Sequence, residues 1–210
     1  NVYHCAPTVT SAANALESSL GSKKVVMATD GAWNVGTFLG PSADFDYAKN
    51  LCFSENAVEK AIQAIKDGAC IVTDTQMAKA GINKRALARY GGEVYCFMSD
   101  EDVAKTAKEN GTTRATASMD KAATLDKKLI FAIGNAPTAL VRLYELIEDG
   151  KLDPELIIGV PVGFVNVVQS KELIMQSGAP YIVARGRKGG SNIAACICNA
   201  LLYMIDNRRD

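Results

Sequence analysis

The 210-residue sequence has a single histidine, His4, near its amino end. A metal site built on several histidines is therefore excluded, and a catalytic triad would have to recruit His4 itself. Lys plus Arg and Asp plus Glu both number 23, so the formal net charge is zero. Because no overall positive field surrounds such a chain, we expect neither nucleic acid nor an anionic membrane as a partner.

Paired cysteines and long apolar runs are also lacking. None of the six cysteines belongs to a CxxC pair, and Cys196 and Cys198 point away from each other in a predicted helix. We expect buried thiols in a reducing compartment. No run approaches the roughly 18 apolar residues of a membrane helix, and no secretory signal is visible. These absences predict a cytoplasmic protein without disulfides or a metal site.

From residue 50 onward, short apolar runs alternate with amphipathic segments. Strands are predicted at residues 70–73, 93–97, 129–133, 156–160 and 181–184. Helices are predicted at residues 55–66 with Ser54 as cap, after a cap at Ser99, at residues 137–150, and along the carboxyl-terminal segment. Unbroken apolar strands are typical of a sheet covered on both faces. The sequence therefore predicts a single α/β domain over residues 1–210, with at least five mostly parallel strands.

Four loops follow the predicted strands, at residues 73–77, 134–138, 161–164 and 185–191. In an open parallel sheet, the loops after the strands meet at the carboxyl edge, where ligands bind. Together these loops combine small residues with hydroxyl, amide and cationic side chains. We call this predicted binding edge the carboxyl rim.

The densest signal is RGRKGGS at residues 185–191, which we call the basic loop. Three cations, Arg185, Arg187 and Lys188, lie within four residues, and three glycines allow a ligand to approach the backbone. The helix that follows has free N–H groups, which favour an anion such as phosphate or carboxylate. The alternative is a solvated basic turn before a helix capped by Ser191. The loop is not a Walker A motif, because it lacks the first glycine and the GK[ST] order.

Two other loops supply weaker signals. In GNAPTAL, at residues 134–140, Asn135 and Thr138 offer an amide and a hydroxyl, although a cap followed by proline is also an ordinary helix start. A glycine turn at residues 110–114 delivers one cation, Arg114.

Three further features complete the candidates. The apolar segment GVPVGFV, at residues 159–165, suits a wall against a flat apolar ligand or a tight packing contact. Lys171 lies near a predicted helix start, where the helix dipole does not favour a cation, and this favours a ligand role. Asp44 and Asp46 could act as paired carboxylates or cap the following segment.

These segments, in this order, resemble the precorrin-8X and cobalt-precorrin-8 methylmutase family. The resemblance covers residues 43–206 and rests on ADFDYAKN (43–50), IVTDTQMAKAGI (71–82), GTTR (111–114), GNAPTAL, GVPVGFV, Ser170-Lys171 and RGRKGGS. It implies a Rossmann-like three-layer sandwich and a homodimer that binds a corrinoid tetrapyrrole near its interface. The implied isomerase shifts the C-11 methyl group to C-12, giving hydrogenobyrinate or cobyrinate in cobalamin biosynthesis, without a cofactor.

The resemblance also implies which residues bind the substrate. The many carboxylates of the ring explain why a neutral protein gathers cations on one edge. The implied substrate-binding residues are Asp44, Thr75, Thr113, Arg114, Asn135, Thr138, Lys171, Arg185, Arg187, Lys188 and Ser191.

Residues 1–40 depart from the family pattern. The family has a histidine, its proposed proton donor, just before the ADFD segment, and Gly40 occupies that position here. His4 is then the candidate catalytic residue. Two other functions remain open: a nucleotide or sugar-phosphate enzyme that uses the same rim for phosphates, and a corrinoid carrier that binds the ring without turnover.

Overall fold

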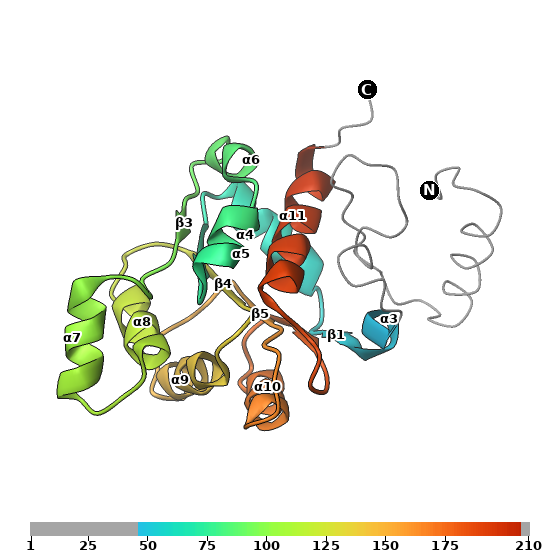
Figure 1. Ribbon diagram of the computed structural model, residues 1–210. Helices are drawn as coiled ribbons and strands as arrows, with labels where there is room; N and C mark the ends of the chain where they lie inside the picture. The colour runs from blue at the N-terminus through green and yellow to red at the C-terminus, as the bar shows by residue number, and fades with distance from the viewer. Residues whose placement is uncertain (1–45, 207–210) are drawn as a thin grey trace.

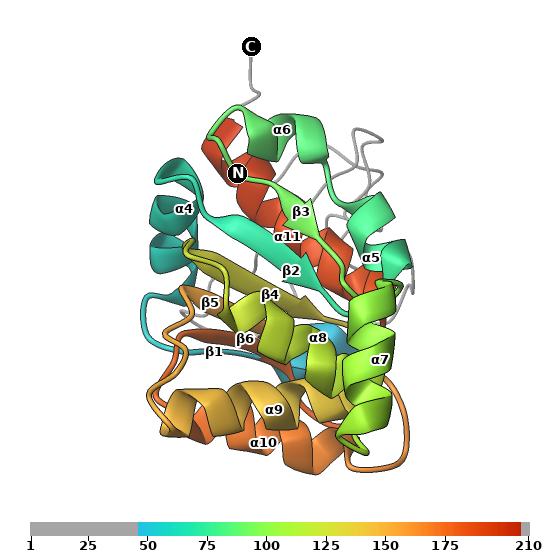
Figure 2. The same cartoon turned by 90° about the vertical axis from the view of Figure 1, so that its left-hand side faces the viewer.

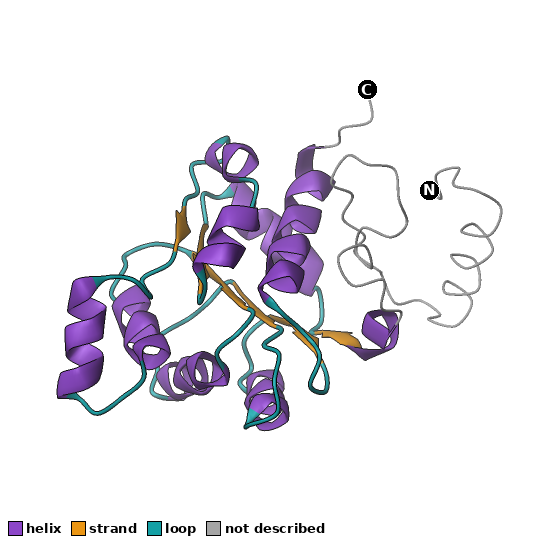
Figure 3. Cartoon of the chain, viewed as in Figure 1, coloured by secondary structure: helices purple, strands orange, loops and turns teal. Residues whose placement is uncertain are grey.

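The computed structural model describes residues 46–206, which form three layers with helices on both sides of a sheet (Figure 1). The elements are α3 (Asp46–Asn50), β1 (Leu51–Phe53), α4 (Ala57–Lys66), β2 (Cys70–Thr73), α5 (Gln76–Gly81), α6 (Lys84–Ala88), β3 (Val94–Tyr95), α7 (Glu101–Glu109), α8 (Arg114–Ala123), β4 (Leu129–Ile133), α9 (Pro137–Glu148), β5 (Leu156–Gly159), α10 (Val167–Gln176), β6 (Tyr181–Ala184) and α11 (Ser191–Asp206). Figure 3 shows how helices and strands alternate. None of the described helices is long and apolar enough to cross a membrane.

The sheet has six strands in the order β1-β6-β5-β4-β2-β3, and β1 alone runs antiparallel to its neighbour. The α/β fold with at least five mostly parallel strands is therefore confirmed. The chain order reverses between β2 and β4, because β3 lies beyond β2 while β5 and β6 follow on the other side of β4. The loop after β2 leads to α5 on the α11 side of the sheet, and the loop after β4 leads to α9 on the other side. In open α/β sheets, ligands bind at the carboxyl edge where the order reverses in this way. That edge lies toward the right in Figure 2.

Strand β4 shows why both faces of the sheet are covered. Ile130 and Ala132 belong to the core cluster that includes side chains of α4, α6 and α11. Leu129, Phe131 and Ile133 belong to the opposite cluster, with side chains of α8, α9 and α10. Each buried aliphatic or aromatic side chain contributes about 1.5–3 kcal/mol through the hydrophobic effect. The unbroken apolar run is thus divided between two cores, as predicted for a covered parallel sheet.

Two predicted helix caps are wrong. Helix α4 begins after Asn56, which has a left-handed backbone, whereas the Ser54 hydroxyl accepts the N–H of Tyr181 at 2.9 Å. Asp100, not Ser99, precedes α7, and the Ser99 hydroxyl accepts a hydrogen bond from Gln76. Both serines therefore join a loop to a distant element, because a hydroxyl serves a long-range partner as readily as a local N–H.

Candidate active site at the carboxyl rim

The centre of the rim is Asp74, which directly follows β2 and is 1 % exposed. Its carboxylate accepts three successive backbone N–H bonds from the loop after β4, from Gly134 at 2.9 Å, Asn135 at 2.8 Å and Ala136 at 2.6 Å. Burial raises the pKa of the Asp74 carboxyl, and the three N–H bonds oppose that rise. The side chain thus ties β2 to the start of α9 at the point where the chain order reverses.

Thr75 and Ser191 lie together on one side of this loop. The Thr75 hydroxyl accepts the N–H of Ala78 at 3.1 Å and donates to the Ser191 hydroxyl at 2.8 Å. A Cβ atom on Gly134 would lie only 2.6 Å from the Cα of Ser191, so glycine is required for this close contact. Because Thr75 donates to Ser191, the Ser191 proton remains available to a ligand.

Thr113 and Thr138 lie together on the other side. Their hydroxyls are 3.2 Å apart, and the Thr113 hydroxyl also accepts the N–H of Thr116 as the cap of α8. This contact brings the start of α8 against the start of α9. Arg114, the first residue of α8, and Asn135 are both exposed at this end. The predicted residues of the two loops are therefore close in space.

Lys171 supports the basic loop from the interior of the protein. This side chain is 1 % exposed, and its ammonium donates to the carbonyl oxygens of Gly186 and Lys188, both at 2.8 Å. Burial lowers the pKa of Lys171 to about 8. The sequence suggested a ligand role for Lys171 near a helix start. In the structure, Lys171 lies within α10, and its ammonium contacts the backbone of the basic loop.

Close backbone packing also fixes the basic loop. Gly190 N–H donates to Val160 O at 2.9 Å, and Gly163 N–H donates to Arg187 O at 3.2 Å. A Cβ atom on Gly189 would lie 2.0 Å from Val160 O. The loop therefore lies directly against the segment after β5, which leaves no space for a side chain at Gly189.

The cations of the rim differ in their surroundings. Within residues 46–206, the exposed guanidinium groups of Arg114, Arg185 and Arg187 have no ion-pair partner. Lys188, in contrast, contacts Asp46 of α3 at 2.6 Å. This contact assigns Asp46 to an ion pair at the helix start. Three of the four predicted rim cations outside Lys171 are thus available to an anionic ligand.

An exposed apolar surface lies beside Arg187. Phe164 and Val165 are 83 % and 76 % exposed, and Val162 is 47 % exposed, all in the loop after β5. The Arg187 guanidinium lies over the Phe164 ring, 5.7 Å from its centroid. Met77, at the start of α5, is also exposed. The rim therefore combines apolar side chains with positive charge, which suits a flat, carboxylate-bearing ligand.

Three positions singled out in the sequence, His4, Gly40 and Asp44, lie outside the described residues. Residues 46–206 contain no histidine. They also contain no group of three or more His, Cys, Asp or Glu side chains that could hold a metal ion.

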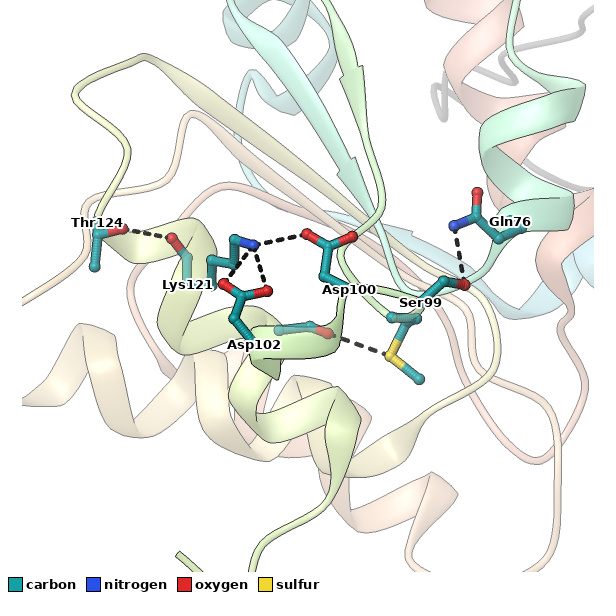
Figure 4. A network of polar contacts seen from close by, with 8 residues as sticks. Gln76, Ser99, Asp100, Asp102, Lys121 and Thr124 are labelled. Carbon is teal, nitrogen blue, oxygen red and sulfur yellow. Dashed lines mark hydrogen bonds and ion pairs between the residues drawn. The ribbon is translucent and has the colours of Figure 1, made fainter. Parts of the chain in front are cut away.

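A second polar cluster lies between α7 and α8 (Figure 4). The Lys121 ammonium contacts the carboxylates of Asp100 and Asp102, each at 2.7 Å, and lies over the Phe97 ring. A cavity of about 210 Å³ beside it is lined by Asp102, Val103, Thr106, Ala117, Asp120, Lys121 and Thr124. Solvent screens these partly exposed pairs, so they contribute little to stability. Since its charges are paired within the protein, the cluster joins two helices and is not the candidate site.

Sequence reasoning missed the roles of Asp74 and Tyr47. The Tyr47 hydroxyl, on a buried side chain, donates to Gly189 O at 3.3 Å and supports the basic loop from α3. A usable signal exists only for Asp74, an acid that directly follows a fully buried strand. No local pattern identifies Tyr47, since its partner is distant in sequence.

Comparisons with known proteins identify the family of this chain. The family described as "CbiC: Precorrin-8X methylmutase" matches residues 38–204. The chain is 48 % identical to the cobalt-precorrin-8 methylmutase of Salmonella typhimurium (77 % of this chain, 76 % of that protein). It is 43 % identical to that of Priestia megaterium (79 % and 74 %). The crystal structure of precorrin-8x methyl mutase from Thermus thermophilus superposes with a TM-score of 0.76 at 32 % identity (94 % and 96 %). This chain therefore belongs to the precorrin-8X methylmutase family, the isomerases that shift the C-11 methyl group of the ring to C-12 in cobalamin biosynthesis.

Proposed function

We propose that the methyl shift takes place at the carboxyl rim, with the ring carboxylates bound by Arg114, Arg185 and Arg187. The observation that carries this proposal is the set of three exposed guanidinium groups without an ion-pair partner among the described residues. Guanidinium groups bind carboxylates through paired, charge-assisted hydrogen bonds. A ring with many carboxylates requires several such groups on one surface.

The apolar face of the ring lies against Phe164 and Val165 in this proposal. An exposed phenylalanine beside a cation suits a flat conjugated ligand, because ring stacking and the nearby guanidinium act together. Contact with the ligand would also remove these side chains from water. The same exposed surface supports a homodimer whose interface adjoins the ring.

The neutral polar groups of the rim orient the ring. Ser191 donates the proton left free by the Thr75 contact, and Asn135 and Thr138 offer an amide and a hydroxyl on the opposite side. Thr113 holds Thr138 and caps α8. An intramolecular methyl shift requires a restrained ring rather than many acid–base groups, so orientation is the main contribution of these residues.

Lys171 and Lys188 have indirect roles. Lys171 positions the basic loop through two backbone carbonyls, because its ammonium is buried. Lys188 links the loop to Asp46 and can also reach a carboxylate at the exposed surface. Asp44 remains a proposed ligand from the family pattern alone.

Proton transfer to the ring is assigned to His4. The family histidine is replaced by Gly40, which has no side chain to donate a proton, and His4 is the single imidazole of the chain. Its ordinary pKa of about 6.5 suits proton exchange near neutral pH.

Cobalt-precorrin-8 is the proposed natural substrate. Both sequence relatives reported above, at 48 % and 43 % identity, have this ring in their names, whereas the precorrin-8x enzyme of known structure is 32 % identical. The proposed location is the cytoplasm, supported by the thiols of Cys52, Cys70, Cys96 and Cys198, which form no disulfide.

Single-turnover absorbance measurements on precorrin-8X and cobalt-precorrin-8 test the proposal. We expect conversion by the wild type, and a loss of ring affinity of about 10–150-fold in Arg187→Ala, since a charged hydrogen bond contributes about 1.5–3 kcal/mol. Arg85→Ala, on the exposed part of α6, is the matched control. Binding without spectral change would identify a corrinoid carrier. Unchanged affinity in Arg187→Ala would remove the basic loop from the site.

A further inference from the structure

The loop at residues 134–136 leads into α9, and its free N–H groups could in principle bind a substrate anion. In this structure those groups are already occupied. Gly134, Asn135 and Ala136 all donate to the Asp74 carboxylate, at 2.6–2.9 Å. The start of α9 can therefore offer side chains to a ligand, but not these three backbone donors.

Burial of the Asp74 carboxylate carries a desolvation cost. Its side chain is 1 % exposed, and no Lys or Arg among residues 46–206 forms an ion pair with it. A buried carboxylate without a cation is destabilising unless hydrogen bonds replace its water. Here two oxygens face three N–H donors, an arrangement that favours the ionised form. The charge is held by backbone dipoles alone, which requires the loop to keep one conformation.

That conformation determines where the polar side chains of the rim lie. Gly134 packs directly against Ser191 at the start of α11. Asn135 and Thr138 lie exposed on the same loop and helix start, with Thr138 in contact with Thr113. Asp74 thus supports both sides of the rim, at the point where the loops after the paired strands β2 and β4 diverge.

We propose that Asp74 is a positioning residue of the methylmutase, an internal anion that occupies the N–H groups of residues 134–136. It keeps the carboxylates of the ring away from the start of α9 and directs them to the arginines. It also holds Asn135 and Thr138 toward the ring. This inference rests on the proposed location of the site.

Asp74→Asn is the first test, because it preserves size but replaces one acceptor oxygen by an NH₂ group that faces an N–H donor. We expect kcat to fall about 10–100-fold, with KM changed less than threefold, because the ring binds to the arginines but is poorly oriented. Asp126→Asn, an exposed acid in the turn before β4, is the matched control. A variant with lowered thermal stability and wild-type kcat would show a purely structural role and overturn the proposal.

A second measurement needs no variant. Hydrogen exchange of the wild type should show protected amides at residues 134–136 without ligand, and hydrogenobyrinate should leave that protection unchanged. Unprotected amides that become protected when hydrogenobyrinate binds would mean that the ligand takes these donors, and the inference would be wrong. Failure of the wild type to convert either substrate would instead refute the proposed function, so the two failures are distinguishable.

Discussion

Replacing Lys171 by methionine separates two effects of one buried ammonium. The ammonium of Lys171 donates hydrogen bonds to Gly186 O and Lys188 O, both at 2.8 Å. These two bonds join α10 to the basic loop. Methionine fills a similar volume but donates nothing. We therefore expect Lys171→Met to release the loop while the surrounding core remains packed.

The structure gives the size of each effect. Lowering the pKa of Lys171 from 10.5 to about 8 means that burial penalises the charged form by about 3 kcal/mol. Lys171→Met removes this penalty, because methionine carries no charge. It also leaves the carbonyl oxygens of Gly186 and Lys188 without a hydrogen-bond donor, which costs about 1–3 kcal/mol for each carbonyl that water does not reach. These terms largely cancel, so the free energy of unfolding at pH 7 should change by less than about 2 kcal/mol. Affinity for hydrogenobyrinate should fall about 10–100-fold, or about 1.4–2.8 kcal/mol.

The pH dependence provides the more specific assay. Between about pH 8 and 10.5 the unfolded chain keeps a proton that folded Lys171 has released. Stability of the wild type should therefore rise with pH across this window, relative to Lys171→Met. Ring affinity should fall in the same window, because a neutral amine donates weaker hydrogen bonds than an ammonium does. Urea titrations and absorbance titrations from pH 7 to 10 measure the two trends.

The reasoning is refuted if Lys171→Met binds hydrogenobyrinate as tightly as the wild type. It is also refuted if the ring affinity of the two proteins shows the same pH dependence above pH 8. Lys84→Met, at an exposed position on α6, is the control for loss of a lysine away from the rim.

Two further predictions concern backbone space and the proton donor. Gly189→Ala should weaken ring binding and lower the unfolding temperature more than Gly150→Ala. The Cβ at position 189 would lie 2.0 Å from Val160 O, whereas at Gly150 there is open space and only the left-handed backbone (φ 67°) opposes alanine. Equal effects on both measurements would show that the basic loop adjusts easily to a side chain at position 189. His4→Ala should slow single turnover about 10²–10⁴-fold, the usual contribution of a general acid. Full activity in His4→Ala would show that no histidine is needed, and Gly40→His should raise turnover if its segment folds as in the family.

The strands could be predicted where the residues of the strand itself carry the pattern. Strands β2, β4 and β6 have the predicted bounds, because unbroken apolar runs flanked by polar residues have few other solutions. Predicted strand 93–97 is only Val94–Tyr95 in the structure. Strand β1 has three residues and exists because it pairs with β6. A strand this short has no recognisable sequence pattern, because its formation depends on pairing with the neighbouring strand.

The candidate site was predictable in its location but not in its internal contacts. Loops after parallel strands must meet at one edge, so Thr75, Asn135 and Ser191 could be placed there from the strand pattern. The contacts of Asp74 and Lys171 are with backbone groups 60 and 15 residues away, respectively. Backbone donors and acceptors are the same for every residue type, so the sequence contains no sign of which ones a buried charge will meet.

The pairing of β1 has a consequence for how the protein folds as it is synthesised. Strand β1 pairs with β6 alone, and most of the described chain lies between them. During translation, β1 must therefore remain without a strand partner until nearly all of the sheet has left the ribosome. Contacts between such distant segments form slowly, because a long loop must close first. Asp46 and Tyr47, just before β1, contact the basic loop just after β6. The basic loop should therefore be the last part of the rim to assemble, after the β2–β5 core is in place.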